Sequence, residues 1–381
     1  MQSVVMMVSV SNASQVVAAL DVFAVLLASL GHDLAHPGVT AAFLVQTRHE
    51  LAMTYNDTSV LENMHTARLF GILKETASNV LAALPESDWR DLRKTVVSSV
   101  LATDMVHHFK MVSDVEVFCE MNEAALQNPE ECAELFKTEK NTHFLLSLFI
   151  HSADIGNPAA SWTSCERWAH RVMDEFFAQG DRERELSMPV SAMFDRETVV
   201  RPVMQVRARA LAGWLAVSSV CLLFPPSLAS SPGGSRSLLL LCRPFSFFPF
   251  CLLVSPQVNF IEFVVAPLYG ALVKLCPPLH TMGQQLVSNR EEWGRQSIAL
   301  IEDGNERAEA TGKEKGRFAA FEAKWAHFNT DVHGVVVPRP TASGRSRAAS
   351  PPPLTPVRKG ASIQMMDIGE GEGEEGHDDD G

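Results

Sequence analysis

The stretch GHDLAHPG carries two imidazoles and a carboxylate, His32, Asp33 and His36, within an otherwise apolar segment. On a helix, positions 32 and 36 lie one above the other, so we expect both imidazoles to project from one face, with Asp33 beside them. Imidazole and carboxylate together suit zinc, manganese, iron or magnesium. Pro37 and Gly38 should end the helix, which predicts a metal-binding cluster near a helix C-terminus.

Other apolar stretches carry polar insertions of the same kind. The insertions are Glu62 with His65, Thr103 with Asp104, and the series His151, Asp154 and Asn157 at three-residue steps. An ordinary ion pair or an exposed histidine would explain any one of them alone. Burying several carboxylates and imidazoles is costly, however, unless they are paired or bound to a metal. We therefore expect these insertions to converge with His32 and Asp33 on one centre.

Helices are the elements that the sequence predicts for positioning these side chains. Apolar residues recur at spacings of three and four, the period of an amphipathic helix. The pattern covers residues 20–33, 57–73, 89–112, 141–155 and 165–184. Asn56, Asp57 and Thr58 supply N-cap side chains for the second of these helices. Strand-type alternation is hard to find, so the sequence predicts an all-α fold.

The composition limits the classes of binding partner and the cellular location that we expect. The chain has 381 residues, is 46% hydrophobic and carries a formal net charge of −13. Acidic residues crowd the C-terminus and no basic stripe is available to neutralise phosphates, so we expect no nucleic-acid partner. The seven cysteines are scattered without a CxxC pair, which favours reduced thiols and a cytoplasmic location. The N-terminus lacks the basic region of a signal peptide.

Residues 206–257 break the helical pattern, because they contain no Asp or Glu and are rich in Leu, Ser, Phe and Pro. One interpretation is a membrane segment, but the longest uncharged apolar run, ALAGWLAVSSVCLLF, is shorter than the roughly 20 residues that a spanning helix needs. The other interpretation is a translated intron. Gln-Val occurs at 205–206 and again at 257–258, so the segment opens with a GT codon and closes with pyrimidine-rich codons before Gln. We favour the in-frame insertion and expect no membrane anchor.

The C-terminal part, residues 335–381, is rich in Pro, Ser and Gly and then acidic. Such a segment cannot bury enough apolar area to fold, so we expect a disordered tail. This leaves residues 1–334 as a single folded domain, interrupted by the 206–257 insertion.

Taken together, the motifs resemble the catalytic domain of class I 3′,5′-cyclic nucleotide phosphodiesterases. The resemblance rests on GHDLAHPG, YNDTSVLENMH, LATDMVHHF, HSADIGNP and QVNFIEFVVAPLY, which occur in the same order as in that family. It covers about residues 20–204 and 257–328. It implies a compact multi-helix domain with a metal pocket at a helix junction. Another HD-type metal phosphohydrolase would share His-Asp but not the later motifs.

The resemblance also implies a two-metal site. His32, Asp33 and Asp154 would bind zinc at the tight site, and Asp33 would be shared with a second metal, magnesium or manganese. The residues that would orient waters and ligands around the metals are His36, Glu62, His65, Thr103 and Asp104. Such surrounding groups fix ligand geometry and metal affinity.

The activity implied is hydrolysis of the 3′ phosphoester bond of cyclic AMP, cyclic GMP or both, giving the 5′-monophosphate in signal transduction. A hydroxide bridging the two metals would attack the phosphorus. Gln257, Phe260 and Asn157 would bind the substrate, with Phe260 stacked on the base. If residues 206–257 are absent from the mature protein, Gln205 takes the place of Gln257.

Several family features are missing from the sequence. No histidine precedes His32, although the family places there the general acid and a fourth ligand of the first metal. The sequence therefore lacks the general-acid His, and we expect the domain to lack its N-terminal helices. Ala35, Met64 and Ala266 are smaller departures from the family pattern. The alternative function is a catalytically impaired, nucleotide- or metal-binding fragment of this family.

Overall fold

The computed structural model describes residues 1–11, 13, 16–191, 193–196, 256–299 and 304–329. Within these ranges every regular element is helical, which confirms the all-α prediction. The helices are α1 (Gln2–Val10), α2 (Ala19–Gly31), α3 (Ala41–Gln46), α4 (Glu50–Thr54), α5 (Val60–Lys74), α6 (Glu86–Leu101), α7 (His108–Met121), α8 (Glu123–Leu126), α9 (Pro129–Leu135), α10 (Glu139–Asp154), α11 (Trp162–Glu185), α13 (Pro256–Phe260), α14 (Ala266–Leu275), α15 (His280–Ala299) and α16 (Gly304–Lys324). The chain divides into two units, Met1–Arg339 and Pro340–Gly381.

Several predictions fall on residues outside the described ranges. Most of the proposed insertion at 206–257, the whole tail at 335–381 and the alternative base-binding residue Gln205 lie there. Cys119, Cys132, Cys165 and Cys276 lie within the described part and are free thiols, in agreement with the scattered spacing.

Short helices complete the described part. Four are single 3-10 turns: η2 (Met105–His107), η3 (Asn157–Ala159), η7 (Pro277–Leu279) and η8 (Ala326–Asn329). The fifth, η6 (Ile261–Val265), is a π-helix that joins α13 to α14 in one continuous rod. The run from Gln257 to Leu275 is long and apolar enough to cross a membrane by length and composition, and 61% of it is buried inside the protein.

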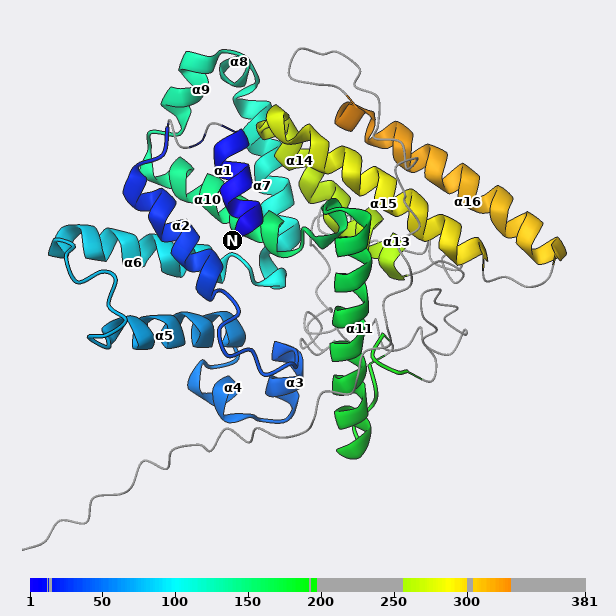
Figure 1. Cartoon of the computed structure of the whole chain (residues 1–381), viewed down its shortest axis with the longest axis horizontal. Coiled ribbons are helices and arrows are strands. Elements are labelled where there is room, and N and C mark those ends of the chain that lie inside the picture. The colour runs from blue at the N-terminus through cyan, green and yellow to red at the C-terminus, as the bar shows by residue number, and fades with distance from the viewer. Residues whose placement is uncertain (12, 14–15, 192, 197–255, 300–303, 330–381) are drawn as a thin grey trace, which may run out of the picture. The chain divides into compact units, whose positions relative to one another are not determined.

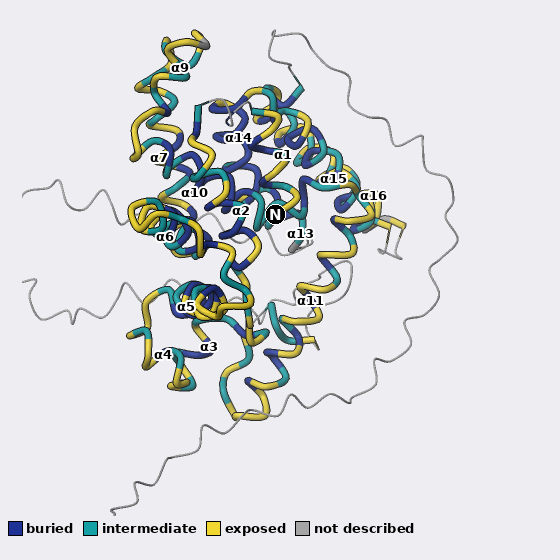
Figure 2. Tube along the Cα trace, turned by 60° about the vertical axis from the view of Figure 1, so that its left-hand side comes forward, coloured by how far each residue is buried: buried dark blue, intermediate teal, exposed yellow. Residues whose placement is uncertain are grey.

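The core lies where α2, α6, α10 and α14 meet, together with the helices beside them. Figure 2 shows the buried stretches of α1, α2, α10 and α14 gathered in the interior. Apolar side chains with almost no exposure fill it, among them Val25, Val96, Leu148, Phe149 and Leu272. A smaller cluster holds α3, α4 and α5 together around Phe43 and Leu44. Burial of this apolar surface is the main force that holds the helices in place.

Met64 belongs to the smaller cluster and is 3% exposed. One of the departures from the family pattern is thus a core side chain on the inner face of α5. It faces apolar neighbours, whereas His65 beside it points elsewhere, toward the carbonyl of Leu34.

The helix ends differ from the predicted ones at the points that matter for chemistry. Helix α2 ends at Gly31, so the prediction that positions 32 and 36 share a helical face is wrong. Four residues further on, Ala35 takes a left-handed backbone, with φ of 61°. Glycine would adopt this conformation at lower cost. Asp33, His36 and their neighbours therefore lie in a turn directly after the helix.

The predicted N-cap of α5 is also wrong. The helix begins at Val60, and its N-cap is Ser59, which has φ of 40° and gives no side-chain cap. Its hydroxyl donates instead to Asp104 Oδ2, at 2.7 Å. The single helix predicted for 89–112 is interrupted after Leu101, where Asp104 caps the short turn η2 before α7 begins.

Candidate metal centre

The ends of α2 and α10 bring His32, Asp33 and Asp154 together. His32 Nε2 lies 3.1 Å from Asp154 Oδ1 and 3.3 Å from Asp33 Oδ2. One ligand atom from each residue lies within 4.8 Å of the other two, so a single ion could contact all three. These side chains, which the family resemblance grouped as metal ligands, thus lie together although Asp154 is more than 100 positions away in the sequence.

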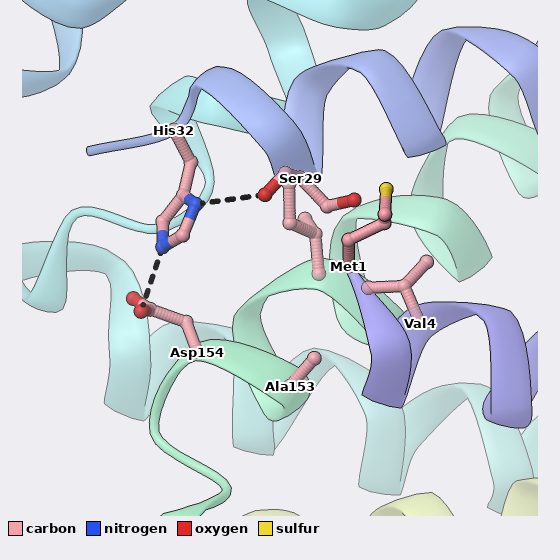
Figure 3. A pocket seen from close by; sticks show the side chains of 7 residues that line it. Met1, Val4, Ser29, His32, Ala153 and Asp154 are labelled. Carbon is pink, nitrogen blue, oxygen red and sulfur yellow. Dashed lines mark hydrogen bonds and ion pairs between the residues drawn. The ribbon is translucent and has the colours of Figure 1, made fainter. Parts of the chain in front are cut away.

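The orientation of the His32 ring suits metal binding. Its Nδ1 lies 3.1 Å from the carbonyl of Ser29, in the last turn of α2, and donates its hydrogen there. Nε2 is thereby directed toward Asp154, as Figure 3 shows, and it also lies near Asp33. A backbone carbonyl that fixes the tautomer of a ligating histidine is the usual arrangement around metals.

In the metal-free protein His32 holds a proton strongly. Burial lowers the pKa of His32, but hydrogen bonds and charge attraction from Asp154 and Asp33 outweigh it and raise the pKa to about 10. The same hydrogen bond from His32 lowers the pKa of Asp33. A metal ion bound by His32 would displace that proton, because a ligating imidazole must be deprotonated.

Asp33, His36 and His65 form a second group that could hold a cation, and it shares Asp33 with the first. His65 Nδ1 donates to the carbonyl of Leu34 at 2.8 Å, which leaves Nε2 3.8 Å from Asp33 Oδ1. The His36 and His65 rings are stacked, with centroids 5.7 Å apart. His36 Nδ1 accepts from the backbone N–H of Gly38 at 3.1 Å. The sharing of Asp33 is what the resemblance implied for two adjacent metals.

Glu62 and Asp104 add negative charge close to these groups. Burial, with repulsion from Asp104, Asp33 and Asp154, raises the pKa of Glu62 to about 7. Both oxygens of Asp104 are engaged, since Oδ1 accepts from the N–H of Val106 and Oδ2 from Ser59. Neighbouring carboxylates favour protonation of one of them, and here that one is Glu62.

Thr103 makes a different contact from the one expected. Its hydroxyl donates to the carbonyl of Val100 at 2.7 Å, and the side chain is buried. It thereby closes the end of α6 and fixes where Asp104 begins the next turn.

A cavity of about 40 Å³ opens beside the first group. It is lined by Ser29, His32, Ala153 and Asp154, and by side chains of α1, as Figure 3 shows. This volume accommodates about one water molecule or small ion. The donors present in the two groups, imidazole nitrogen and carboxylate oxygen, are ligands that divalent metal ions accept.

The predicted substrate-binding residues come from two other elements. Asn157 is half-buried at the start of η3, directly after the end of α10 that carries Asp154. Gln257 and Phe260 are half-buried on α13, and Phe260 packs against the main core. Helix α13 contacts α15.

Two polar contacts in the core are not predictable from the sequence pattern. His108 Nδ1 lies 2.9 Å from His151 Nε2, and both side chains are fully buried. Burial lowers the pKa of His108 and, helped by repulsion from His108, lowers that of His151 to about 4. Tyr269 donates to the carbonyl of Ser152 at 2.8 Å, in the last turn of α10. The signals in the sequence are the pair His107-His108 and Tyr269 in an apolar run, but neither shows its partner.

A family model described as 3′5′-cyclic nucleotide phosphodiesterase matches residues 1–211. The chain belongs to this family. The mouse dual specificity calcium/calmodulin-dependent 3′,5′-cyclic nucleotide phosphodiesterase 1C is 39% identical over 188 residues, 49% of this chain and 24% of that protein. A probable 3′,5′-cyclic phosphodiesterase of Caenorhabditis elegans is 37% identical over 180 residues, 47% of this chain and 25% of that protein.

A crystal structure of the phosphodiesterase domain of the RhoPDE fusion protein from the choanoflagellate Salpingoeca rosetta has the same architecture. It matches with a TM-score of 0.57 and 26% identity, over 79% of this chain and 78% of that chain. The predicted phosphodiesterase fold is thus confirmed. The match spans about a quarter of the length of the curated relatives.

Proposed function

We propose that this phosphodiesterase hydrolyses the 3′ phosphoester bond of a cyclic nucleotide to give the 5′-monophosphate. The observation that carries the proposal is the convergence of His32, Asp33 and Asp154 within ligating distance of one another. Asp33 belongs also to the second group, which supports an arrangement of two adjacent cations. The matched family supports the class of reaction.

Divalent cations held by these groups would neutralise the charge that develops on the phosphate and make a bound water acidic enough to lose its proton near neutral pH. His32 and Asp154 would hold the first cation, and Asp33 would contact both. His36 and His65 would hold the second cation or its waters. Glu62 is suited to accept a hydrogen bond or a proton from a water, since its pKa is raised to about 7.

The nucleotide base would lie against α13. Gln257 offers an amide donor and acceptor that can rotate to suit adenine or guanine, so the proposal covers cyclic AMP and cyclic GMP. Phe260 would stack on the base, and Asn157 would hydrogen-bond near the ribose. Asn157 directly follows the helix end that carries Asp154, so base and phosphate would be held by adjoining elements.

The departing 3′ oxygen needs a proton, and in this family a histidine before the His-Asp motif donates it. No histidine precedes His32 in the 381-residue sequence. Without a general acid, turnover is expected to fall by roughly 10²–10⁴-fold. For this polypeptide we therefore expect binding of metal and nucleotide with slow hydrolysis.

The test uses the purified 381-residue protein, loaded with zinc and magnesium and incubated with cyclic AMP or cyclic GMP. The mouse relative assayed in parallel gives the reference rate, and chromatography identifies the product. We expect 5′-monophosphate at a rate at least about 100-fold below the reference, and none from Asp154→Asn. A 3′-monophosphate product, or equal rates with and without metal, would contradict the proposal. Metal and nucleotide binding without any hydrolysis would favour the impaired fragment.

A further inference from the structure

We infer that Arg317 of α16 is a positioning residue for nucleotide recognition, because it bridges α13, which carries Gln257 and Phe260, and the π-helix η6 that follows it. The inference rests on the proposed function, in which these two residues bind the base.

The π-helix η6 needs a structural cause. It follows Phe260 directly and joins α13 to α14 without a break. A π-turn accommodates one extra residue and is rare, and it occurs mostly at functional sites. One residue corresponds to about 100° of helical rotation, so relaxation of η6 to a regular helix would turn Gln257 and Phe260 relative to the buried helix α14.

A carboxylate within the π-turn is held by two arginines from other helices. Glu262 Oε1 accepts from Arg290 Nε at 2.7 Å, and Glu262 Oε2 accepts from Arg317 Nε at 2.8 Å and from Nη2 at 2.6 Å. Arg290 also pairs with Glu314, so two positive and two negative charges form a neutral, largely buried cluster. Charged groups persist in such places only when each is paired.

Arg317 contacts one residue of α13 and one residue of η6. Its Nη2 donates to Asn259 Oδ1 at 2.8 Å as well as to Glu262. Asn259 immediately precedes Phe260, and Glu262 is the second residue after it. One guanidinium therefore bridges both sides of the proposed stacking residue, which a lysine ammonium could not do with the same geometry.

Arg290 and Arg317 differ in how they can be tested. Arg290 is fully buried among Phe318, Phe321 and two carboxylates, so its removal would disturb the core. The Arg317 side chain is 21% exposed, and its loss leaves Glu262 still paired with Arg290. Helices α15 and α16, which supply the two arginines, lie side by side in Figure 1.

The experiment compares the full chain with Arg317→Gln and Arg317→Lys. Lys315→Gln is the matched control, because Lys315 is an exposed cation on the same helix. Binding of a fluorescent cyclic AMP analogue and hydrogen exchange by mass spectrometry are measured on each, together with zinc content.

For Arg317→Gln we expect nucleotide affinity to fall about tenfold and exchange to quicken in residues 256–265, with zinc content and exchange in α2 and α10 unchanged. Arg317→Lys should lie between, and Lys315→Gln should match the unaltered chain. Unchanged exchange in residues 256–265, or faster exchange there with unchanged nucleotide affinity, would overturn the inference. Faster exchange throughout the core, and not only in these residues, would overturn it as well. An unaltered chain that binds no cyclic nucleotide would overturn the proposed function and the recognition role with it. The exchange data would still decide whether Arg317 holds the π-turn.

Discussion

Zinc binding to this protein should release one proton, and its affinity should rise steeply with pH. In the metal-free site His32 is protonated, because the carboxylates of Asp154 and Asp33 raise its pKa to about 10 despite burial. Zinc needs the Nε2 lone pair that this proton occupies. Every bound ion must therefore displace it.

The size of the effect follows from that pKa. At pH 7 the protonated form of His32 exceeds the neutral one by about 1000-fold, so apparent zinc affinity lies about 1000-fold below its limit at high pH. It should increase about tenfold per pH unit from pH 6.5 to 8.5. Competition with a chromophoric chelator at several pH values measures the slope, and calorimetry in buffers of different ionisation enthalpy counts the protons.

Two controls make this prediction sharp. In His32→Gln the slope should disappear, because no titrating group remains between the carboxylates. In Asp154→Asn the pKa of His32 should fall, because the contact that raises it most is lost. Zinc affinity should then reach its plateau at a lower pH than in the unaltered protein. A flat profile in the unaltered protein, with no proton released at pH 7, would refute the reasoning that links His32 to both carboxylates.

Three further outcomes test other parts of the structure. Glu62→Gln should stabilise the metal-free protein by roughly 1–3 kcal/mol at pH 8 but not at pH 4. The reason is that the stability which protonated Glu62 contributes below pH 4.5 is lost as pH rises through about 7. Chemical denaturation at both pH values measures the difference. Asp33→Asn should lower the content of both metals, whereas Asp154→Asn should lower only the first, as elemental analysis would show. Gly156→Ala should destabilise the fold by about 1–3 kcal/mol in thermal melts, because its Cβ would lie 2.5 Å from Tyr269 Oη.

Helical periodicity was sufficient to predict the fold class and the main helices. The apolar faces of residues 141–155 and 165–184 correspond closely to α10 and α11. Helix ends were less accessible, because they depend on contacts between distant segments. Ser59 does not cap α5 with its side chain, because its hydroxyl donates to Asp104. Ala35 takes a left-handed backbone before the chain reaches Pro37. Local sequence propensity predicts neither of these features.

The candidate site was predictable to the extent that its chemistry is local. Polar residues in apolar surroundings pointed to His32, Asp33 and Asp154 among several clusters, the family resemblance grouped these three as ligands, and the structure brings them together. The Glu262 cluster was not foreseen, because arginines and glutamates at ordinary spacing look like surface residues. Their partners lie 24 to 55 residues away in the sequence, on other helices.

The buried pair of His108 and His151 limits how this sequence can change over evolutionary time. One imidazole must donate where the other accepts, across 2.9 Å and out of reach of solvent. A single replacement strands one polar nitrogen in the core, at a cost of about 1–3 kcal/mol. Routes to another residue pair at these two positions therefore pass through a weakened intermediate. Related sequences should therefore keep histidine at both positions or replace both residues together.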